Sequence, residues 1–241
     1  MRLAIVSDIH ANLEALDAVL ADIDARQVDD VVCLGDFVGY GASPNECVER
    51  LRPRISGAVI GNHDAAAVGR LSLGDFNSDA ATAARWTEGS LSAESRAYLE
   101  GLPYTIARGA ALLVHASPLE PEAWHYVLSP TDAAEEFEAF VEPICFIGHS
   151  HFPGAFERAG EEMRYSRLSE VATQPGRRYI VNVPSVGQPR DSDPRAGYAL
   201  WDDQRGIVQH VRLEYDVDGA MKRIRDAGLP PFLAERLRWG E

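Results

Sequence analysis

Residues 1–12 of the chain read MRLAIVSDIHAN. Leu3 to Ser7 form a short, mainly apolar run, which is typical of a strand buried on both faces. Asp8 and His10 follow at once, so two polar side chains stand where this strand ends. Asn12 then precedes apolar residues at helical spacing and is expected to be an N-cap. The stretch therefore predicts a strand followed by a helix, which is the opening unit of an α/β fold.

The first half of the chain continues this alternation. Strands are predicted at 31–34 and 58–60, and a helix that opens at Ser43-Pro44 lies between them, with the proline at its first position. Strand–helix–strand at this spacing indicates parallel pairing through right-handed crossovers. Further on, the sequence predicts mainly helix at 65–101, two strands that meet at Gly109 within 104–115, a helix at 130–140 and a strand at 144–147.

After Phe152 the pattern changes to short strands separated by turns. The close succession predicts an antiparallel meander made of strands at 154–159, 162–167, 178–183, 196–203 and 206–214. From about Val217 the chain is expected to be helical, with Gly228 to Pro231 between two pieces. We interpret residues 1–241 as one domain with a helical insertion at about 65–101, which could cap one edge, and a C-terminal helical tail at about 217–241.

Composition restricts the class of protein. Apolar residues make up 46% and charged residues 25% of the 241 residues, as in ordinary folded proteins. The net charge of −14 offers no basic face, so duplex nucleic acid is disfavoured as a partner. Three cysteines without a CxxC pair argue against disulfides or a thiolate zinc site and favour the cytoplasm. We expect no signal peptide and no membrane span.

Polar side chains follow five of the predicted strands, and ligands in α/β sheets gather at the carboxyl ends of strands. Five of the seven histidines belong to this set, whereas a single histidine on an apolar strand is more often a core residue. Carboxylate, amide and imidazole groups together suit Mn, Fe or Zn and fit poorly with Ca. The set comprises Asp8, His10, Asp36, Asn62, His63, His115, His149 and His151.

The spacing inside the motifs also favours a shared site. In Asp8-x-His10 and His149-x-His151, one intervening residue would point both side chains the same way from an extended segment. Glycines precede Asp36, Asn62 and His149, and a glycine permits a tight turn and close approach of the backbone.

The order D-x-H, GD, GNHD, a single His and GHSH resembles the calcineurin-like metallophosphoesterase superfamily. The matching motifs run from Asp8 to His151, and the segment NVPSVGQPRD at 182–191 looks like the NPGSVGQPR-type loop of bacterial members. The resemblance implies an α/β fold of four layers, α/β/β/α, in which two mixed sheets are flanked by helices.

The resemblance also implies a dinuclear centre of Mn, Fe or Zn, in which a hydroxide between the metals is the nucleophile. His63 takes the family position of a general acid or transition-state stabiliser; the alternative is an unused imidazole beside the site. Asp36 bridges the metals. One metal takes Asp8, His10, Asp36 and His151, and the other takes Asp36, Asn62, His115 and His149.

Two departures from the family weaken a protein-phosphatase interpretation. Those enzymes carry GDxVDRG, whereas residues 35–41 read GDFVGYG. Gly39 replaces the aspartate that orients the catalytic histidine, and Tyr40 replaces an arginine that binds phosphate. Asp64 is a candidate substitute partner for His63.

The candidate substrate-binding residues are Asn62, Tyr40, Arg190 and His125. Arg190 could supply the missing guanidinium or be a plain surface residue, and Tyr40 could contact the leaving group or pack in the core. Trp124-His125-Tyr126 offers aromatic faces suited to a base; the alternative is a loop packed on the sheet edge.

We therefore expect a metal-dependent phosphoric ester hydrolase that acts on a small phosphodiester or nucleotide. The alternatives are a dinucleoside-polyphosphate pyrophosphatase, a phosphomonoesterase, and a non-catalytic protein-binding scaffold of the same fold. The complete ligand set argues against the scaffold. A homo-oligomer is possible on the sequence.

Overall fold

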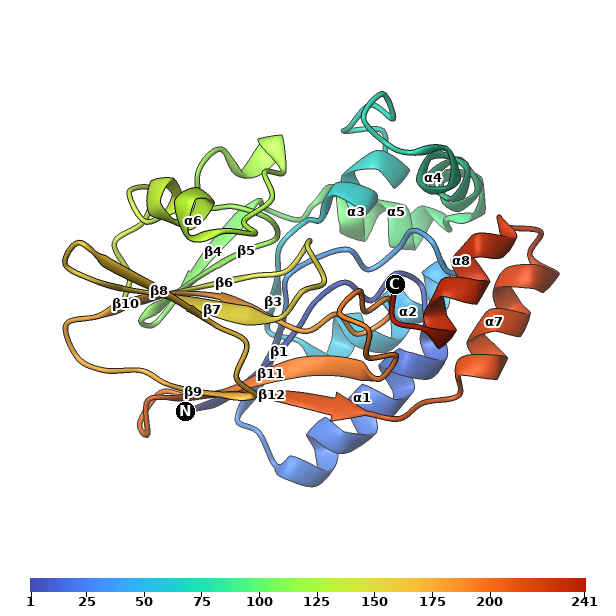
Figure 1. The fold of residues 1–241 in the computed structure, drawn as a ribbon. Coiled ribbons are helices and arrows are strands. Elements are labelled where there is room, and N and C mark those ends of the chain that lie inside the picture. The colour runs from blue at the N-terminus through green and yellow to red at the C-terminus, as the bar shows by residue number, and fades with distance from the viewer.

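Strand β1 lies in the middle of the first of two sheets in the computed structural model, which describes residues 1–241 (Figure 1). It runs parallel to β2 and antiparallel to β11, and β3 runs parallel to β2. The parallel pairing predicted for the first three strands is therefore confirmed. The strand order is β3 (Gly57–Ala58), β2 (Asp30–Cys33), β1 (Arg2–Val6), β11 (Ala196–Asp202), β12 (Ile207–Leu213) and β9 (Glu170–Ala172).

The second sheet also has six strands, and its central part is parallel. Strand β6 pairs in parallel with β5 on one side and with β10 on the other. The strand order is β4 (Thr105–Arg108), β5 (Ala111–Val114), β6 (Ile144–Ile147), β10 (Arg178–Asn182), β7 (Gly154–Ala159) and β8 (Glu162–Ser166).

The predicted antiparallel meander is wrong in its pairing. Only the hairpins β7–β8 and β11–β12 follow that pattern, and they belong to different sheets. Strand β10 enters between β6 and β7, because the buried run from Tyr179 to Asn182 needs a neighbour on each side. The short strand β9 at the edge of the first sheet was not predicted.

Burial on alternate faces of β1 explains the layers. Ala4 and Val6 pack against α1 (Leu13–Arg26) and α2 (Pro44–Leu51) on the outside, whereas Leu3 and Ile5 face the second sheet. On the far side, α6 (Pro130–Glu136) covers the second sheet, and Figure 1 shows α1 and α6 on opposite outer surfaces. The four-layer α/β/β/α architecture is confirmed. Each fully buried aliphatic side chain of this kind contributes about 1.5–3 kcal/mol.

The predicted start of two helices is confirmed, whereas the predicted end of a third helix is wrong. Asn12 caps α1 by accepting a hydrogen bond from the Ala15 N–H, and Pro44 is the first residue of α2. Helix α6 ends at Glu136, earlier than predicted. The Glu136 carboxylate turns inward and accepts hydrogen bonds from Ser117 Oγ and the Leu119 N–H. All three cysteines are buried and free.

The remaining helices lie together on the right-hand side of Figure 1. The region predicted as a helical insertion contains three helices, and residues 68–77 between the first two are not helical. No helix has the length and apolar character needed to cross a membrane. The helices are α3 (Asn62–Ala67), α4 (Ser78–Ser90), α5 (Ala93–Glu100), α7 (Val217–Asp226) and α8 (Pro231–Glu235), with short 3₁₀ helices at Arg52–Arg54, Pro121–Ala123 and Arg236–Arg238.

Candidate metal centre

The seven predicted metal ligands lie together at the carboxyl ends of five strands. These strands come from both sheets: β1, β2 and β3 from the first, and β5 and β6 from the second. The site therefore sits where the edges of the two sheets meet, and all seven side chains are buried: Asp8, His10, Asp36, Asn62, His115, His149 and His151.

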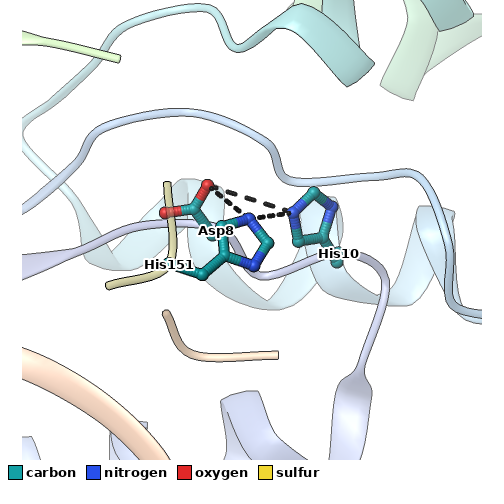
Figure 2. A group of neighbouring side chains, drawn as sticks. All are labelled: Asp8, His10 and His151. Atoms are coloured by element: carbon teal, nitrogen blue, oxygen red, sulfur yellow. Dashed lines mark hydrogen bonds and ion pairs between the residues drawn. The ribbon is translucent and has the colours of Figure 1, made fainter. Parts of the chain in front are cut away.

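Asp8, His10 and His151 form the first group of ligand atoms (Figure 2). His151 Nε2 lies 3.2 Å from Asp8 Oδ1 and 3.0 Å from His10 Nε2. His10 Nε2 lies 3.6 Å from Asp36 Oδ2. Ligand atoms about 2.1 Å from a transition-metal ion are roughly 3.0–3.4 Å apart, depending on the coordination geometry. These side chains therefore fit one cation.

Asp36, Asn62, His115 and His149 form the second group. His115 Nε2 lies 3.3 Å from Asp36 Oδ2 and 3.3 Å from Asn62 Oδ1. His149 Nδ1 lies 3.1 Å from Asn62 Oδ1. These separations fit a second cation equally well. Asp36 Oδ2 is the atom that faces both groups, which suits a bridging ligand.

In three of the imidazole rings, a backbone carbonyl determines which ring nitrogen carries the proton and which one presents a lone pair. The Nδ1 atoms of His10, His115 and His151 lie within hydrogen-bond distance of the carbonyl oxygens of Val38, Leu34 and Gln188, respectively. A carbonyl only accepts, so each Nδ1 carries the proton when the ring is neutral, and each Nε2 presents a lone pair to the site. This is the ring orientation that metal-binding histidines require.

Burial keeps most of these rings neutral. It lowers the pKa of His10 and His151 and lowers that of His149 to about 3. His115 differs: burial favours its neutral form, but the Asp36 and Asp8 carboxylates and the Leu34 carbonyl together outweigh burial and raise the pKa of His115 to about 9. The proton on His115 compensates for the Asp36 charge, and a bound cation supplies the same compensation.

Five of the seven predicted ligand residues have a left-handed backbone. Asp8, His10, Asp36, His149 and His151 have φ between 48° and 63°, a conformation that costs a non-glycine residue on the order of 1 kcal/mol. The expectation that Asp8-x-His10 and His149-x-His151 are extended segments is therefore wrong. The side chains converge because the backbone turns after each strand, and hydrogen bonds such as His10 N–H to Asp36 O, 2.9 Å, hold that turn.

Residue 61 has to be glycine because the Asp36 side chain lies directly against its Cα atom. A Cβ atom there would overlap Asp36 Oδ1, the oxygen that accepts a hydrogen bond of 2.8 Å from the His63 N–H. The glycine thus allows the first turn of α3 to lie directly on the Asp36 carboxylate.

His63 is buried beside the two groups, and no acidic side chain orients it. Its Nδ1 has no hydrogen-bond partner, and burial lowers the pKa of the ring to about 4. Asp64 points away and accepts from the Val38 N–H at 3.2 Å and the Gly61 N–H at 3.1 Å, so it does not pair with His63. The ring is instead held by packing, 4.3 Å from Tyr40 and 5.0 Å from Phe76 between centroids.

A cavity of about 290 Å³ opens over these groups, and Asn62, His63, Tyr40 and Arg190 line it. Arg190 is its only lysine or arginine. One Nη of Arg190 donates to Tyr40 Oη at 3.2 Å and to Gln188 Oε1 at 2.9 Å. Tyr40 also packs in a cluster with α4 and the C-terminal helices, so its ring is both a core residue and a cavity wall.

His125 does not line the cavity. Its side chain is 50% exposed and lies 3.4 Å from Glu120, whereas its neighbours Trp124 and Tyr126 do line the cavity. The substrate-binding prediction for His125 therefore has no support in the geometry. Phe76 and Asp75, in the loop before α4, are lining residues that sequence reasoning missed, because no motif marks that loop.

Comparisons with known proteins identify the family of this chain. The family model described as the calcineurin-like phosphoesterase superfamily domain matches residues 1–206. An uncharacterized protein of Methanocaldococcus jannaschii is 39% identical over 99% of this chain and 98% of its own length.

Two solved structures extend the comparison to the fold. A metallophosphoesterase from Sphaerobacter thermophilus has a TM-score of 0.88 and 44% identity, covering 100% of this chain and 99% of that one. A hypothetical protein from Pyrococcus horikoshii has a TM-score of 0.78 at 21% identity, covering 100% of this chain and 98% of that one, which is a likeness of fold.

Proposed function

Because this chain belongs to the calcineurin-like phosphoesterase superfamily, we propose that it hydrolyses a small phosphodiester or nucleotide with the help of two transition-metal ions. The observation that carries the proposal is Asp36 Oδ2, which lies 3.6 Å from His10 Nε2 and 3.3 Å from His115 Nε2 and so faces both ligand groups. When bound, a pair of Mn, Fe or Zn ions lowers the pKa of a coordinated water and offsets charge on the phosphoryl oxygens.

The chain's own residues then hold the ester and assist the leaving group. Arg190 binds a phosphoryl oxygen from the Tyr40 side of the cavity, because its guanidinium lines that wall and is already held by Tyr40 and Gln188. Asn62 contributes its amide beside the phosphorus. His63, whose ring burial keeps neutral by lowering its pKa to about 4, stabilises the leaving oxygen as a hydrogen-bond donor, or as a general acid where the phosphoryl charge raises that pKa.

The sequence favours a diester over a monoester, because Tyr40 stands where protein phosphatases of the family carry a phosphate-binding arginine. Arg190 is the single cationic side chain that lines the cavity, beside the metal ions that the centre would hold. Phosphomonoesters and dinucleoside polyphosphates are the alternative substrates. A non-catalytic protein-binding scaffold is disfavoured because the ligand set is complete. The three buried, free cysteines support a cytoplasmic location.

The test begins with metal analysis of the purified protein. Bis-p-nitrophenyl phosphate and p-nitrophenyl phosphate are then compared with Mn, Fe or Zn present. We expect close to two metal ions per chain and faster hydrolysis of the diester. A strong preference for the monoester contradicts the diester assignment. A protein that binds no metal and hydrolyses neither ester contradicts the enzyme assignment.

A further inference from the structure

Three aromatic side chains in the cavity each contact a different imidazole of the site. Trp124 lies edge-on to His115, with ring centroids 5.9 Å apart, and Phe76 lies edge-on to His63 at 5.0 Å. Tyr126 stacks on His149 at 4.1 Å with an interplanar angle of 28°. Trp124 and Tyr126 follow β5, and Phe76 precedes α4, so two separate loops bring aromatic rings to the entrance of the metal centre.

The loop that carries Trp124 has a strained backbone. Glu120 and Trp124, which flank the 3₁₀ helix Pro121–Ala123, have φ of 49° and 58°. Such conformations persist in non-glycine residues only where the surroundings impose them, and they gather at functional sites. Tyr104 supports the Trp124 ring at 5.8 Å, and Arg70 lies 4.9 Å over the Tyr104 ring. Trp124 is thus held in place before any ligand arrives.

The outer part of the cavity is uncharged or acidic. Arg190, the single cation of the lining, is bound to the buried Tyr40, whereas the exposed lining residues of the loop before α4 are Asp75, Asn77 and Ser72. A polyphosphate chain that extended outward would meet the Asp75 carboxylate and no compensating cation. A neutral group with N–H or O–H donors suits this wall, because the Asp75 carboxylate accepts such bonds. Asn77 Oδ1 and Ser72 Oγ already accept hydrogen bonds from the Ala80 and Gly74 N–H groups and keep one lone pair each.

The aromatic rings, the charge and the size of the cavity point to one ligand class. We propose that the outer cavity is a subsite for one nucleoside, whose base stacks on Trp124 or Phe76 while its single phosphoryl group lies at the metal centre. A volume of about 290 Å³ is at the lower end for ligand pockets and suits one nucleoside, not two joined by a polyphosphate. The proposal rests on the proposed phosphoesterase function and names its substrate class.

Matched substrates that differ only in the base test the subsite. Adenosine 5′-monophosphate is compared with ribose 5-phosphate, and a thymidine dinucleotide with the same dimer made of abasic residues. Base stacking on an aromatic side chain changes affinity by roughly 10- to 100-fold, so we expect kcat/KM to be higher by that factor for the base-containing member of at least one pair.

Variants then assign the preference to the aromatic rings. In Trp124→Ala or in Phe76→Ala, according to which ring the base stacks on, the ratio of kcat/KM between the two members of the preferred pair should fall by about tenfold. Trp239→Ala is the control, because Trp239 is 62% exposed and does not line the cavity. Metal content is measured for each variant, and the milder Trp124→Phe replaces any alanine variant that does not fold.

The outcomes separate the two proposals. Equal kcat/KM within both pairs, with p-nitrophenyl esters still hydrolysed, overturns the nucleoside subsite and leaves the phosphoesterase function standing. A base preference that survives both alanine substitutions also overturns the subsite. Absence of hydrolysis of every ester, p-nitrophenyl esters included, overturns the function itself.

Discussion

The Nε2 atoms of His10 and His151 lie 3.0 Å apart, and the Nδ1 atom of each ring faces a backbone carbonyl oxygen. In the neutral rings, two lone pairs therefore point at each other beside the Asp8 carboxylate. Such an arrangement is unfavourable unless a cation lies between the atoms.

Metal binding should consequently stabilise the fold. Metal at a concentration about 100-fold above its dissociation constant adds roughly 3 kcal/mol, which raises the melting temperature of a chain of this size by about 5–10 °C. Differential scanning calorimetry of chelator-treated protein, with and without Mn or Zn, measures the shift. The variant His10→Ala/His151→Ala should show a much smaller shift; an equal shift would place the stabilising metal elsewhere.

Asp36→Asn should abolish activity. The substitution removes the negative charge that both ligand groups share, so we expect metal content to fall and kcat to drop at least about 100-fold. Asp17→Asn is a matched control, because Asp17 is a surface residue paired with Arg50 at 3.3 Å. If Asp36→Asn keeps near-normal turnover, the bridging assignment is wrong.

His63→Gln separates catalysis from metal binding. We expect kcat to fall by about 100-fold or more while both metals stay bound, since removal of a general acid typically costs that much. Atomic absorption on the same preparation gives the metal content. Because His63 also lies within reach of His10 and Asp36, loss of a metal in this variant would identify His63 as a ligand.

Gly39→Ala should damage the site through His63. Gly39 has φ of +91°, and a Cβ atom there would lie 2.5 Å from His63 Nδ1, so the imidazole has to move. The matched control is Gly176→Ala, where φ is +79° and the space is open. Both variants should lose about 1 kcal/mol of stability from backbone strain, but only Gly39→Ala should lower kcat. Equal activity in both variants would show that the position of His63 does not limit turnover.

His210 should make the fold less stable in mild acid. Burial, assisted by Arg212, lowers the pKa of His210 from 6.5 to about 4. Between these values the unfolded chain binds the proton and the folded chain does not, so stability is present above pH 6.5 and is lost as pH falls towards 4. The loss between pH 7 and pH 5 is about 1–2 kcal/mol from this residue.

Urea unfolding at both pH values measures this loss in the native chain and in His210→Gln. The buried histidines of the metal centre titrate in both proteins, so the difference between them isolates His210. A variant that loses as much stability as the native chain would contradict the assignment.

Residue type and local periodicity were sufficient to predict which polar side chains lie at the ends of the strands. A polar residue directly after a buried strand, as at Asp8 and His115, must lie at the end of that strand wherever the strand sits in the fold. The same local signals predicted the N-cap of α1 at Asn12 and most strand and helix positions. These features depend on neighbours a few residues apart.

Only the tertiary structure decided how the strands pair and where the side chains after them point. The five strands belong to two sheets, β10 runs parallel to β6, and Asp8 and His10 adopt left-handed backbones. The structure also turns Asp64 away from His63 and brings Phe76, not His125, to the cavity. Strand pairing and loop direction depend on burial against residues that are distant in the sequence, as where Arg2 pairs with Asp202 and Tyr179 with Ile144. A local pattern contains no information about those partners.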